Sequence, residues 1–206
     1  MSRRFLIYRL VCLGIVLGTL AGCTSGSPPA RFYLLGSLAQ GEVPSTVVAE
    51  EGPAVLVGPV TLAAYLDRDQ LIARSGPVEL QVAPFDRWAE PLADGFYRVL
   101  QENLSVLLDT ARIGTVLQQS AAAADFQVGI HISRFDQDAD GGAHLTAFWS
   151  LENIRAAGPV LRKKTVVRVA AASPALGDRV QAQDQALTVF SREIAAASAD
   201  AAKPHP

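Results

Sequence analysis

The chain has 206 residues, of which 50% are hydrophobic and 18% are charged. This composition is typical of one globular domain with appendages, and it excludes a wholly disordered chain. A formal net charge of −2 gives no general attraction to nucleic acid, and two cysteines exclude a disulfide-stapled scaffold and a multi-thiolate zinc site. No apolar run reaches the ~20 residues that a membrane-spanning helix needs.

Residues 1–22 have the layout of a secretory signal. Arg3 and Arg4 precede an apolar run from Leu10 to Leu20, and small residues follow it. The sequence Leu20-Ala-Gly-Cys23 resembles the bacterial lipobox, in which the signal is cut before the cysteine and the cysteine is acylated. We therefore expect a lipoprotein signal peptide over 1–22 and acyl chains such as palmitate on Cys23. One acyl chain gives only marginal membrane binding, whereas two or more give stable anchoring.

Residues 23–30 are small, polar and proline-containing, and we expect them to form a flexible tether. In known lipoproteins an aspartate directly after the acylated cysteine favours retention at the inner membrane. Thr24 stands at this position. The resemblance therefore favours the periplasmic face of the outer membrane over retention at the inner membrane.

Short aromatic and β-branched runs predict strands in the first half of the domain. We place these strands at 31–35, 46–48 (inside a long loop over 36–53), 54–57, 70–74 and 78–82. We expect the strand at 54–57 to stop at Gly58-Pro59. A turn at 75–77 is expected to join the last two strands into a hairpin.

A helix is predicted over about 90–109, because apolar residues recur there at steps of three and four. Beyond Ala121 the hydrophobic period changes to two. This change predicts a strand from Phe126, a turn at 136–142, a second strand through Leu151, a turn at Gly158-Pro159 and a third strand over 160–171. Three strands joined in this way form an antiparallel meander.

A final helix is expected over 178–199. We predict a single α+β domain over 31–199 and a disordered tail over 200–206. The domain would have a largely antiparallel sheet of five to six strands with both amphipathic helices packed on one face. The other face would be left to water or a partner.

The chain has no standard catalytic or nucleotide-binding motif, so we expect neither enzymatic activity nor a cofactor. The sequence Asp136-x-Asp138-x-Asp140-Gly141 matches the opening of a calcium loop. Position twelve of that loop is Ala147, where calcium binding requires glutamate. An acidic hairpin turn is therefore the preferred interpretation, with no metal site.

Two groups of polar residues on the predicted meander offer further hypotheses. His131, Ser133 and His144 are candidate parts of a hydrolase site, and we favour a hydrated sheet face instead. Basic residues share one face of the third meander strand, with Lys163 on the opposite face. This strip is either a solvated face or a docking strip for an acidic partner or lipid phosphates; its residues are Arg162, Lys164 and Arg168.

Several segments together resemble the ABC-type transport auxiliary lipoproteins, the PqiC/YmbA-like group. The lipobox and Phe32-Tyr-Leu-Leu35 come first in the chain. The segments that follow are Val57-Gly-Pro-Val60, Tyr65-Leu-Asp-Arg68, Gln70-Leu-Ile-Ala-Arg74, Arg87-Trp-Ala-Glu-Pro-Leu92, Val99-Leu100 and Glu102-Asn-Leu104. The chain departs from the family at Ala64 and Asp69, where prolines are usual.

The resemblance implies a non-enzymatic periplasmic lipoprotein that works in lipid traffic across the envelope and supports membrane integrity. Its implied partners are an MCE-domain protein and inner-membrane transport subunits, and some members form homo-oligomeric rings. The alternatives are a lipid carrier with its own groove, a periplasmic hydrolase, and an assembly factor for an outer-membrane protein. Besides the basic strip, the interface candidates are Tyr65, Leu66, Asp67, Arg68, Arg74 and Trp88.

Overall fold

The computed structural model describes residues 27–38, 51–118, 124–155 and 160–203. The chain divides into a segment up to Ala30 and a body from Arg31 onward, and the elements given below belong to the body. The expected signal peptide, Cys23, the strand at 46–48 and the turn at 158–159 lie outside the described residues. No helix in the described ranges has the length and apolar character needed to cross a membrane.

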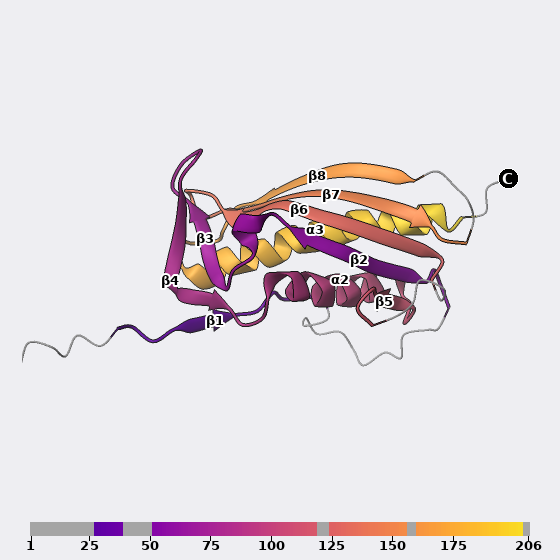
Figure 1. Ribbon diagram of the computed structural model, residues 1–206, viewed down its shortest axis with the longest axis horizontal. Helices are drawn as coiled ribbons and strands as arrows, with labels where there is room; N and C mark the ends of the chain where they lie inside the picture. Colours follow the sequence, from indigo (N-terminus) through magenta and orange to yellow (C-terminus); the bar gives the residue numbers. More distant parts are fainter. Residues whose placement is uncertain (1–26, 39–50, 119–123, 156–159, 204–206) are drawn as a thin grey trace, which may run out of the picture. The chain divides into compact units, whose positions relative to one another are not determined.

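The body is one eight-stranded sheet with both long helices on one of its faces (Figure 1). The elements are β1 (Arg31–Tyr33), β2 (Val55–Leu62), the short 3-10 helix η2 (Ala64–Leu66), β3 (Gln70–Arg74), β4 (Leu80–Trp88), α2 (Leu92–Leu108), β5 (Ile113–Thr115), β6 (Phe126–Gln137), β7 (Ala143–Asn153), β8 (Leu161–Val169) and α3 (Leu176–Ala201). The α+β prediction is confirmed, although the sheet has eight strands rather than five to six. One addition is β5, which the pattern did not indicate.

The predicted meander is confirmed, because β6 pairs antiparallel with β7 and β7 pairs antiparallel with β8. The predicted hairpin is also present as the antiparallel pair β3 and β4. The remaining pairs are parallel: β1 with β4, β2 with β5, β2 with β6, and one residue pair, Ala73 with Gln137, between β3 and β6. These pairs join segments that are distant in sequence, so local turns do not predict them.

The prediction that a strand ends at Gly58-Pro59 is wrong. β2 continues to Leu62, and its pairing with β6 is interrupted only between Val57 and Val60. The Val60 N–H donates to the Tyr97 hydroxyl of α2 over 2.9 Å, so this backbone group keeps a partner at the irregularity. A local bulge therefore absorbs the Gly-Pro pair without ending the strand.

α2 lies within the predicted range, directly after Pro91 and with Asp94 in its first turn. Proline is compatible with a helix start because its missing N–H has no partner there. The buried face of the helix packs under the sheet, and the Phe96 ring meets Phe135 of β6 edge to face at 4.9 Å. This contact fixes α2 beneath the end of β6 that carries the polar residues described below.

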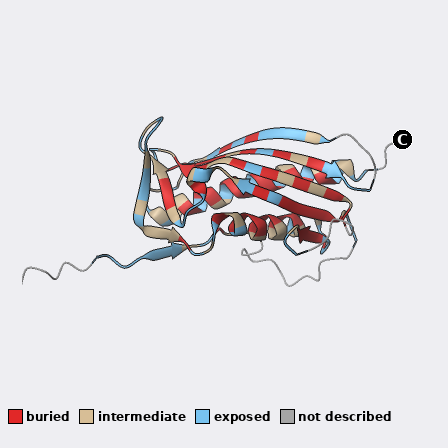
Figure 2. Ribbon diagram, in the orientation of Figure 1, coloured by how far each residue is buried: buried red, intermediate tan, exposed pale blue. Residues whose placement is uncertain are grey.

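α3 buries the predicted apolar stripe and extends to Ala201, two residues beyond its expected end. Large side chains occupy the space between the helices and the sheet, and the buried positions follow the inner face of the strands (Figure 2). The largest of them include Phe96, Leu100, Leu104, Ile132, Leu187, Phe190 and Ile194. This packing covers the inner face of the sheet, while neither α2 nor α3 covers the opposite face.

Side chains from α2 and α3 hold the segment that follows β1. Three hydrogen bonds do this: Arg98 Nη2 to Leu35 O (2.9 Å), Gly36 N to Asp184 Oδ1 (2.9 Å) and Leu38 N to Asn103 Oδ1 (2.7 Å). Asn103 also donates to Ser191 of α3 over 3.0 Å, so it links three parts of the fold. This bridge accounts for asparagine within the Glu102-Asn-Leu104 segment.

Candidate functional site

The candidate site is the outer face of the sheet, defined as the face opposite α2 and α3 on β2, β6, β7 and β8. Side chains that alternate with the buried ones point to this face, as period-two strands require (Figure 2). It includes two large apolar side chains with substantial exposure, Phe148 at 47% and Val166 at 51%. Because cations lie beside these apolar side chains, we take this face as the candidate binding surface.

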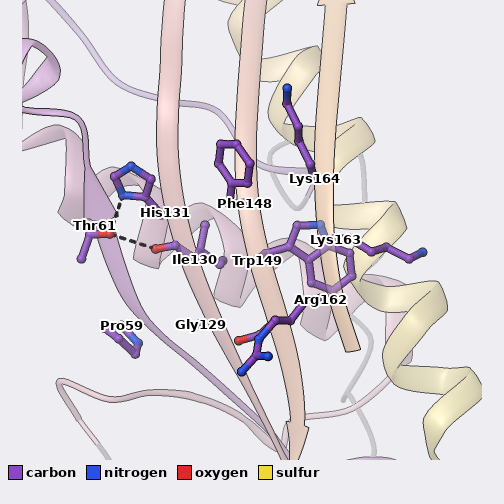
Figure 3. Close-up of a pocket in the computed structure, with 11 residues that line it drawn as sticks. Pro59, Thr61, Gly129, Ile130, His131, Phe148, Trp149, Arg162, Lys163 and Lys164 are labelled. Carbon is purple, nitrogen blue, oxygen red and sulfur yellow. Dashed lines mark hydrogen bonds between the residues drawn. The ribbon is translucent and has the colours of Figure 1, made fainter. Parts of the chain in front are cut away.

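Two neighbouring rows of side chains shape a shallow hollow on the outer face (Figure 3). One row is tall and runs across four strands through Thr61, His131, Phe148 and Lys164. The next row is low, because Gly129 and Ser150 lie side by side before Arg162. The result is a hollow of about 490 Å³ with a small-residue floor, an aromatic wall and a basic rim.

The basic strip lies as predicted, with Arg162, Lys164 and Arg168 exposed on the outer side of β8 and Lys163 on the other side. The Lys164 ammonium lies 5.5 Å from the centre of the Phe148 ring, and Arg168 Nε lies 3.4 Å from His144 Nδ1. None of the three forms an ion pair with a carboxylate among the described residues. Their charge is therefore available to an external partner.

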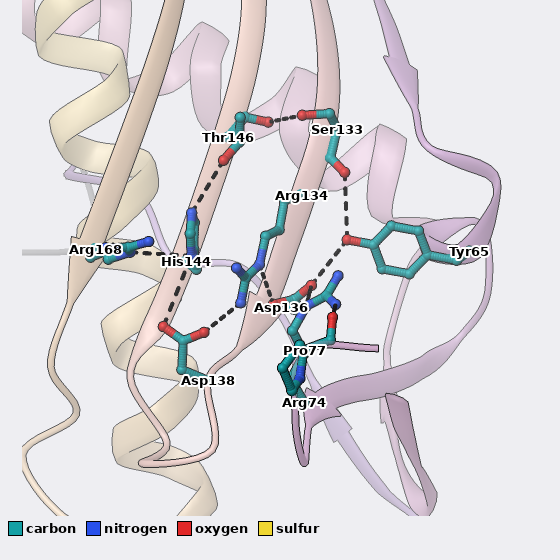
Figure 4. A network of polar contacts seen from close by, with 10 residues as sticks. All are labelled: Tyr65, Arg74, Pro77, Ser133, Arg134, Asp136, Asp138, His144, Thr146 and Arg168. Atoms are coloured by element: carbon teal, nitrogen blue, oxygen red, sulfur yellow. Dashed lines mark hydrogen bonds and ion pairs between the residues drawn. The ribbon is translucent and has the colours of Figure 1, made fainter. Parts of the chain in front are cut away.

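A buried carboxylate, Asp136, organises the far end of the outer face (Figure 4). Its side chain is fully buried and accepts hydrogen bonds from Tyr65 Oη (3.0 Å), Arg74 Nε (3.0 Å) and Arg134 Nε (2.8 Å). Arg134 also pairs with Asp138. The expected hairpin turn therefore begins later than predicted, because Asp136 belongs to β6 and is an ion-pair centre rather than a turn residue.

Tyr65 and Arg74 have a structural role in this network. The Arg74 guanidinium lies 5.8 Å from the Tyr65 ring centre, and both residues contact Asp136. Burial, followed by the neighbouring Asp136, raises the pKa of the Tyr65 hydroxyl, so the hydroxyl stays protonated and donates. Through these contacts the η2–β3 segment is fastened to β6.

The other candidates in this region divide into buried and exposed residues. Leu66 and Trp88 are only 2% and 7% exposed, and Trp88 stacks on Phe135, so both support the surface from within the core. Asp67 and Arg68 are exposed, and Arg68 Nε donates to the Tyr65 carbonyl over 2.9 Å. Of the Tyr65-Leu-Asp-Arg68 segment, only Asp67 and Arg68 are exposed.

The histidines do not assemble the hydrolase site that was considered. His131 Nδ1 lies 2.9 Å from Thr61 Oγ1, and Ser133 Oγ donates to the Thr146 carbonyl. His144 contacts Thr146, Arg168 and Asp138, and burial followed by Arg134 and Arg168 lowers the pKa of its imidazole. No serine hydroxyl contacts an imidazole within the described ranges, and no group of three metal-ligating side chains occurs there.

Sequence reasoning missed Arg134 and Phe148, and it assigned Asp136 to a turn rather than to this network. The alternation of β7 could have identified Phe148, because it is a large apolar residue on the face opposite Trp149. No local signal identifies Asp136 as buried. Its partners Tyr65 and Arg74 precede it by more than 60 residues.

The chain belongs to the family of ABC-type transport auxiliary lipoprotein components, because the family model matches residues 33–195. It is accordingly a lipoprotein and an auxiliary component of an ABC-type transporter. Such a protein is anchored by lipid in the cell envelope, and the description of the family as auxiliary suggests a non-catalytic role. No curated protein matches the chain.

Two of the solved structures that the chain resembles share its fold. An uncharacterized protein is 18% identical with a TM-score of 0.66, covering 82% of this chain and 99% of its own. Protein XCC0632 from Xanthomonas campestris, described under DUF330, is 20% identical with a TM-score of 0.62, covering 80% of this chain and 92% of its own. The PelC dodecamer from Paraburkholderia phytofirmans is 12% identical with a TM-score of 0.39, covering 70% of this chain and 91% of its own, a similarity too low to bear on assembly.

Proposed function

We propose that this lipoprotein docks and scaffolds an MCE-type, ABC-type lipid-transport system at the periplasmic face of the outer membrane and thereby supports membrane integrity. The partners are an MCE-domain protein and inner-membrane transport subunits. Family membership supports the link to an ABC-type transporter. The observation that carries the docking role is the outer face, which neither α2 nor α3 covers, with its basic strip at Arg162, Lys164 and Arg168 that no described carboxylate compensates.

The N-terminus supplies the anchor in this proposal. Residues 1–22 are removed as a signal peptide, Cys23 is acylated, and residues 23–30 act as the tether to the domain that begins at Arg31. At ~3.3 Å per residue such a tether keeps the body within a few tens of ångströms of the leaflet. Anchoring raises the effective concentration of the outer face for partners at that membrane without adding a contact. Assembly of copies into a homo-oligomeric ring, which the family resemblance implies for some members, would multiply this effect.

The packing of the body favours a scaffold over a lipid carrier. A carrier needs an apolar groove between the helices and the sheet, whereas large side chains occupy that space here. The hollow on the outer face is shallow and has a basic rim. These features fit the docking of an acidic partner better than the enclosure of acyl chains.

A site-specific crosslinking experiment tests the docking role. A photoreactive phenylalanine analogue replaces Phe148 on the outer face, or Val189, a similarly exposed apolar residue on α3, as the matched control. We expect crosslinks from position 148 to envelope transport subunits and none from position 189. The double variant Arg162→Glu with Arg168→Glu should weaken the same crosslinks. Equal crosslinking at both positions, or the absence of transport subunits from the products, would overturn the docking role.

Membrane fractionation tests the anchor separately. A Cys23→Ser chain should keep its signal peptide uncleaved or leave the outer-membrane fraction, because the acylated sulfur is absent. If this variant is processed normally and stays with the outer membrane as firmly as the unmodified sequence, the proposed anchor is wrong.

A further inference from the structure

β8 lies at an open edge of the sheet. Its nine residues, Leu161–Val169, pair along one side with β7, and no other described strand pairs with the other side (Figure 1). An edge strand presents unpaired backbone N–H and C=O groups, which can accept an additional strand. The length of β8 is sufficient for an added strand of ordinary length.

The outer side of this edge has a strong charge pattern. Four side chains point outward at alternate positions of β8: Arg162, Lys164 and Arg168 are basic, and Val166, between Lys164 and Arg168, is apolar. A strand added at the edge would place every second side chain beside these four. Carboxylates opposite the three cations and an apolar side chain opposite Val166 would match this pattern in charge and polarity.

The inner side of β8 holds the strand in place. Trp149 Nε1 donates to Thr165 Oγ1 over 2.9 Å, and Thr165 Oγ1 donates to Glu193 Oε2 of α3 over 2.6 Å. Lys163 Nζ lies 3.6 Å from Glu193 Oε1. This network fastens β8 to β7 and α3, so an added strand meets an edge that is already ordered.

A second copy of this chain is a poor occupant of the edge. Antiparallel pairing of two β8 strands about Thr165 places Arg162 of each copy opposite Arg168 of the other, and Lys164 opposite Val166. Like charges directly opposite each other destabilise a strand pair. The charge pattern therefore selects a different and acidic chain.

We propose that β8 accepts an extended segment of a protein partner as a ninth strand, and that this segment has acidic residues at alternate positions. This inference rests on the proposed function only in taking the partner to be a subunit of the transport system. The added strand forms backbone hydrogen bonds along β8. Its carboxylates face Arg162, Lys164 and Arg168, and its apolar side chain covers Val166.

The test uses the full lipid-anchored chain in detergent and a fluorescent peptide, acetyl-Glu-Thr-Val-Thr-Glu-Thr-Glu-amide. We expect saturable binding, measured by fluorescence anisotropy, and slower amide hydrogen exchange over 161–169 when the peptide is bound. The double variant Arg162→Glu with Lys164→Glu should bind at least about tenfold more weakly, because attraction becomes repulsion. Arg192→Glu changes an exposed arginine on α3 and should leave binding unchanged.

N-methylated peptides separate strand addition from attraction by charge alone. Two versions, methylated at alternate sets of amides, keep the charges, but in each a different set of N–H groups is lost. At least one of them should lose binding. Undiminished binding of both versions, or no binding of the parent peptide, overturns the proposal.

The peptide-binding experiment and the crosslinking experiment at position 148 test separate claims. Failed peptide binding with successful crosslinking at position 148 rejects only strand addition. Peptide binding without any transport subunit among the crosslinks rejects only the proposed function.

Discussion

Removal of the Asp136 carboxylate is expected to destabilise the domain strongly. The substitution Asp136→Ala leaves the Tyr65 hydroxyl and the guanidinium groups of Arg74 and Arg134 without their shared acceptor. Breaking a buried ion pair by removing one partner costs about 3–5 kcal/mol. The two arginine side chains are 21% and 22% exposed, so water recovers part of their solvation. We therefore expect a loss of about 3 kcal/mol in the free energy of unfolding.

Urea unfolding followed by tryptophan fluorescence and circular dichroism measures this loss. For a domain of this size, about 3 kcal/mol corresponds to a fall in Tm of about 6–12 °C. Asp136→Asn keeps one acceptor oxygen and loses the charge, so it should be milder, at about 1–2 kcal/mol. Asp67→Ala removes an exposed carboxylate and serves as the control, with a change within about 0.5 kcal/mol.

A double-mutant cycle tests whether the carboxylate acts through its arginines. Asp136→Ala combined with Arg74→Met should cost less than the sum of the two single changes, with a coupling energy of at least about 1 kcal/mol. A loss below about 1 kcal/mol for Asp136→Ala, or additive effects in the cycle, would refute the assignment of Asp136 as the centre of this network.

Three further changes test other parts of the fold. Burial raises the pKa of Asp184 to about 6 from 3.8, so the folded state binds the proton more tightly and stability falls as the pH rises from about 4 to 6. Asp184→Asn should flatten that slope and increase stability at pH 7 by up to about 2 kcal/mol in pH-dependent urea titrations, whereas an unchanged slope would contradict the assignment. Asn103→Ala leaves the Leu38 N–H without its acceptor, and it should cost about 2–3 kcal/mol and speed exchange of that amide; unaltered exchange would argue against the bridge. Gly58→Ala should lower the urea midpoint by an amount equivalent to about 1–3 kcal/mol, because φ is +118° and the new Cβ would lie 2.7 Å from Tyr97 Cε1; an unchanged midpoint would be inconsistent with this packing.

Local periodicity was sufficient for the elements whose neighbours in space are also neighbours in sequence. The three- and four-residue steps of α2 and the alternation of β6, β7 and β8 were read directly from the residues. The same alternation put Arg162, Lys164 and Arg168 on one face of β8. These features depend on side-chain direction along a single element, which the backbone period fixes.

The sequence pattern did not predict the parallel pairs of the sheet, β5, or the continuation of β2 beyond Gly58-Pro59. Val60 resumes pairing with Ile130, a residue 70 positions away, and this pairing extends the strand across the irregularity. A turn signal is local, whereas pairing with a distant strand supplies hydrogen bonds that the turn signal does not describe.

The sequence by itself determined both helices and the meander, the family resemblance, and the shared face of the basic strip. Only the tertiary structure decided that Asp136 is buried and that Trp88 and Leu66 belong to the core. The reason is that an acidic residue after a strand favours a turn unless distant partners neutralise its charge. Folding brings Tyr65 and Arg74 to Asp136, and together with the neighbouring Arg134 they stabilise the buried carboxylate.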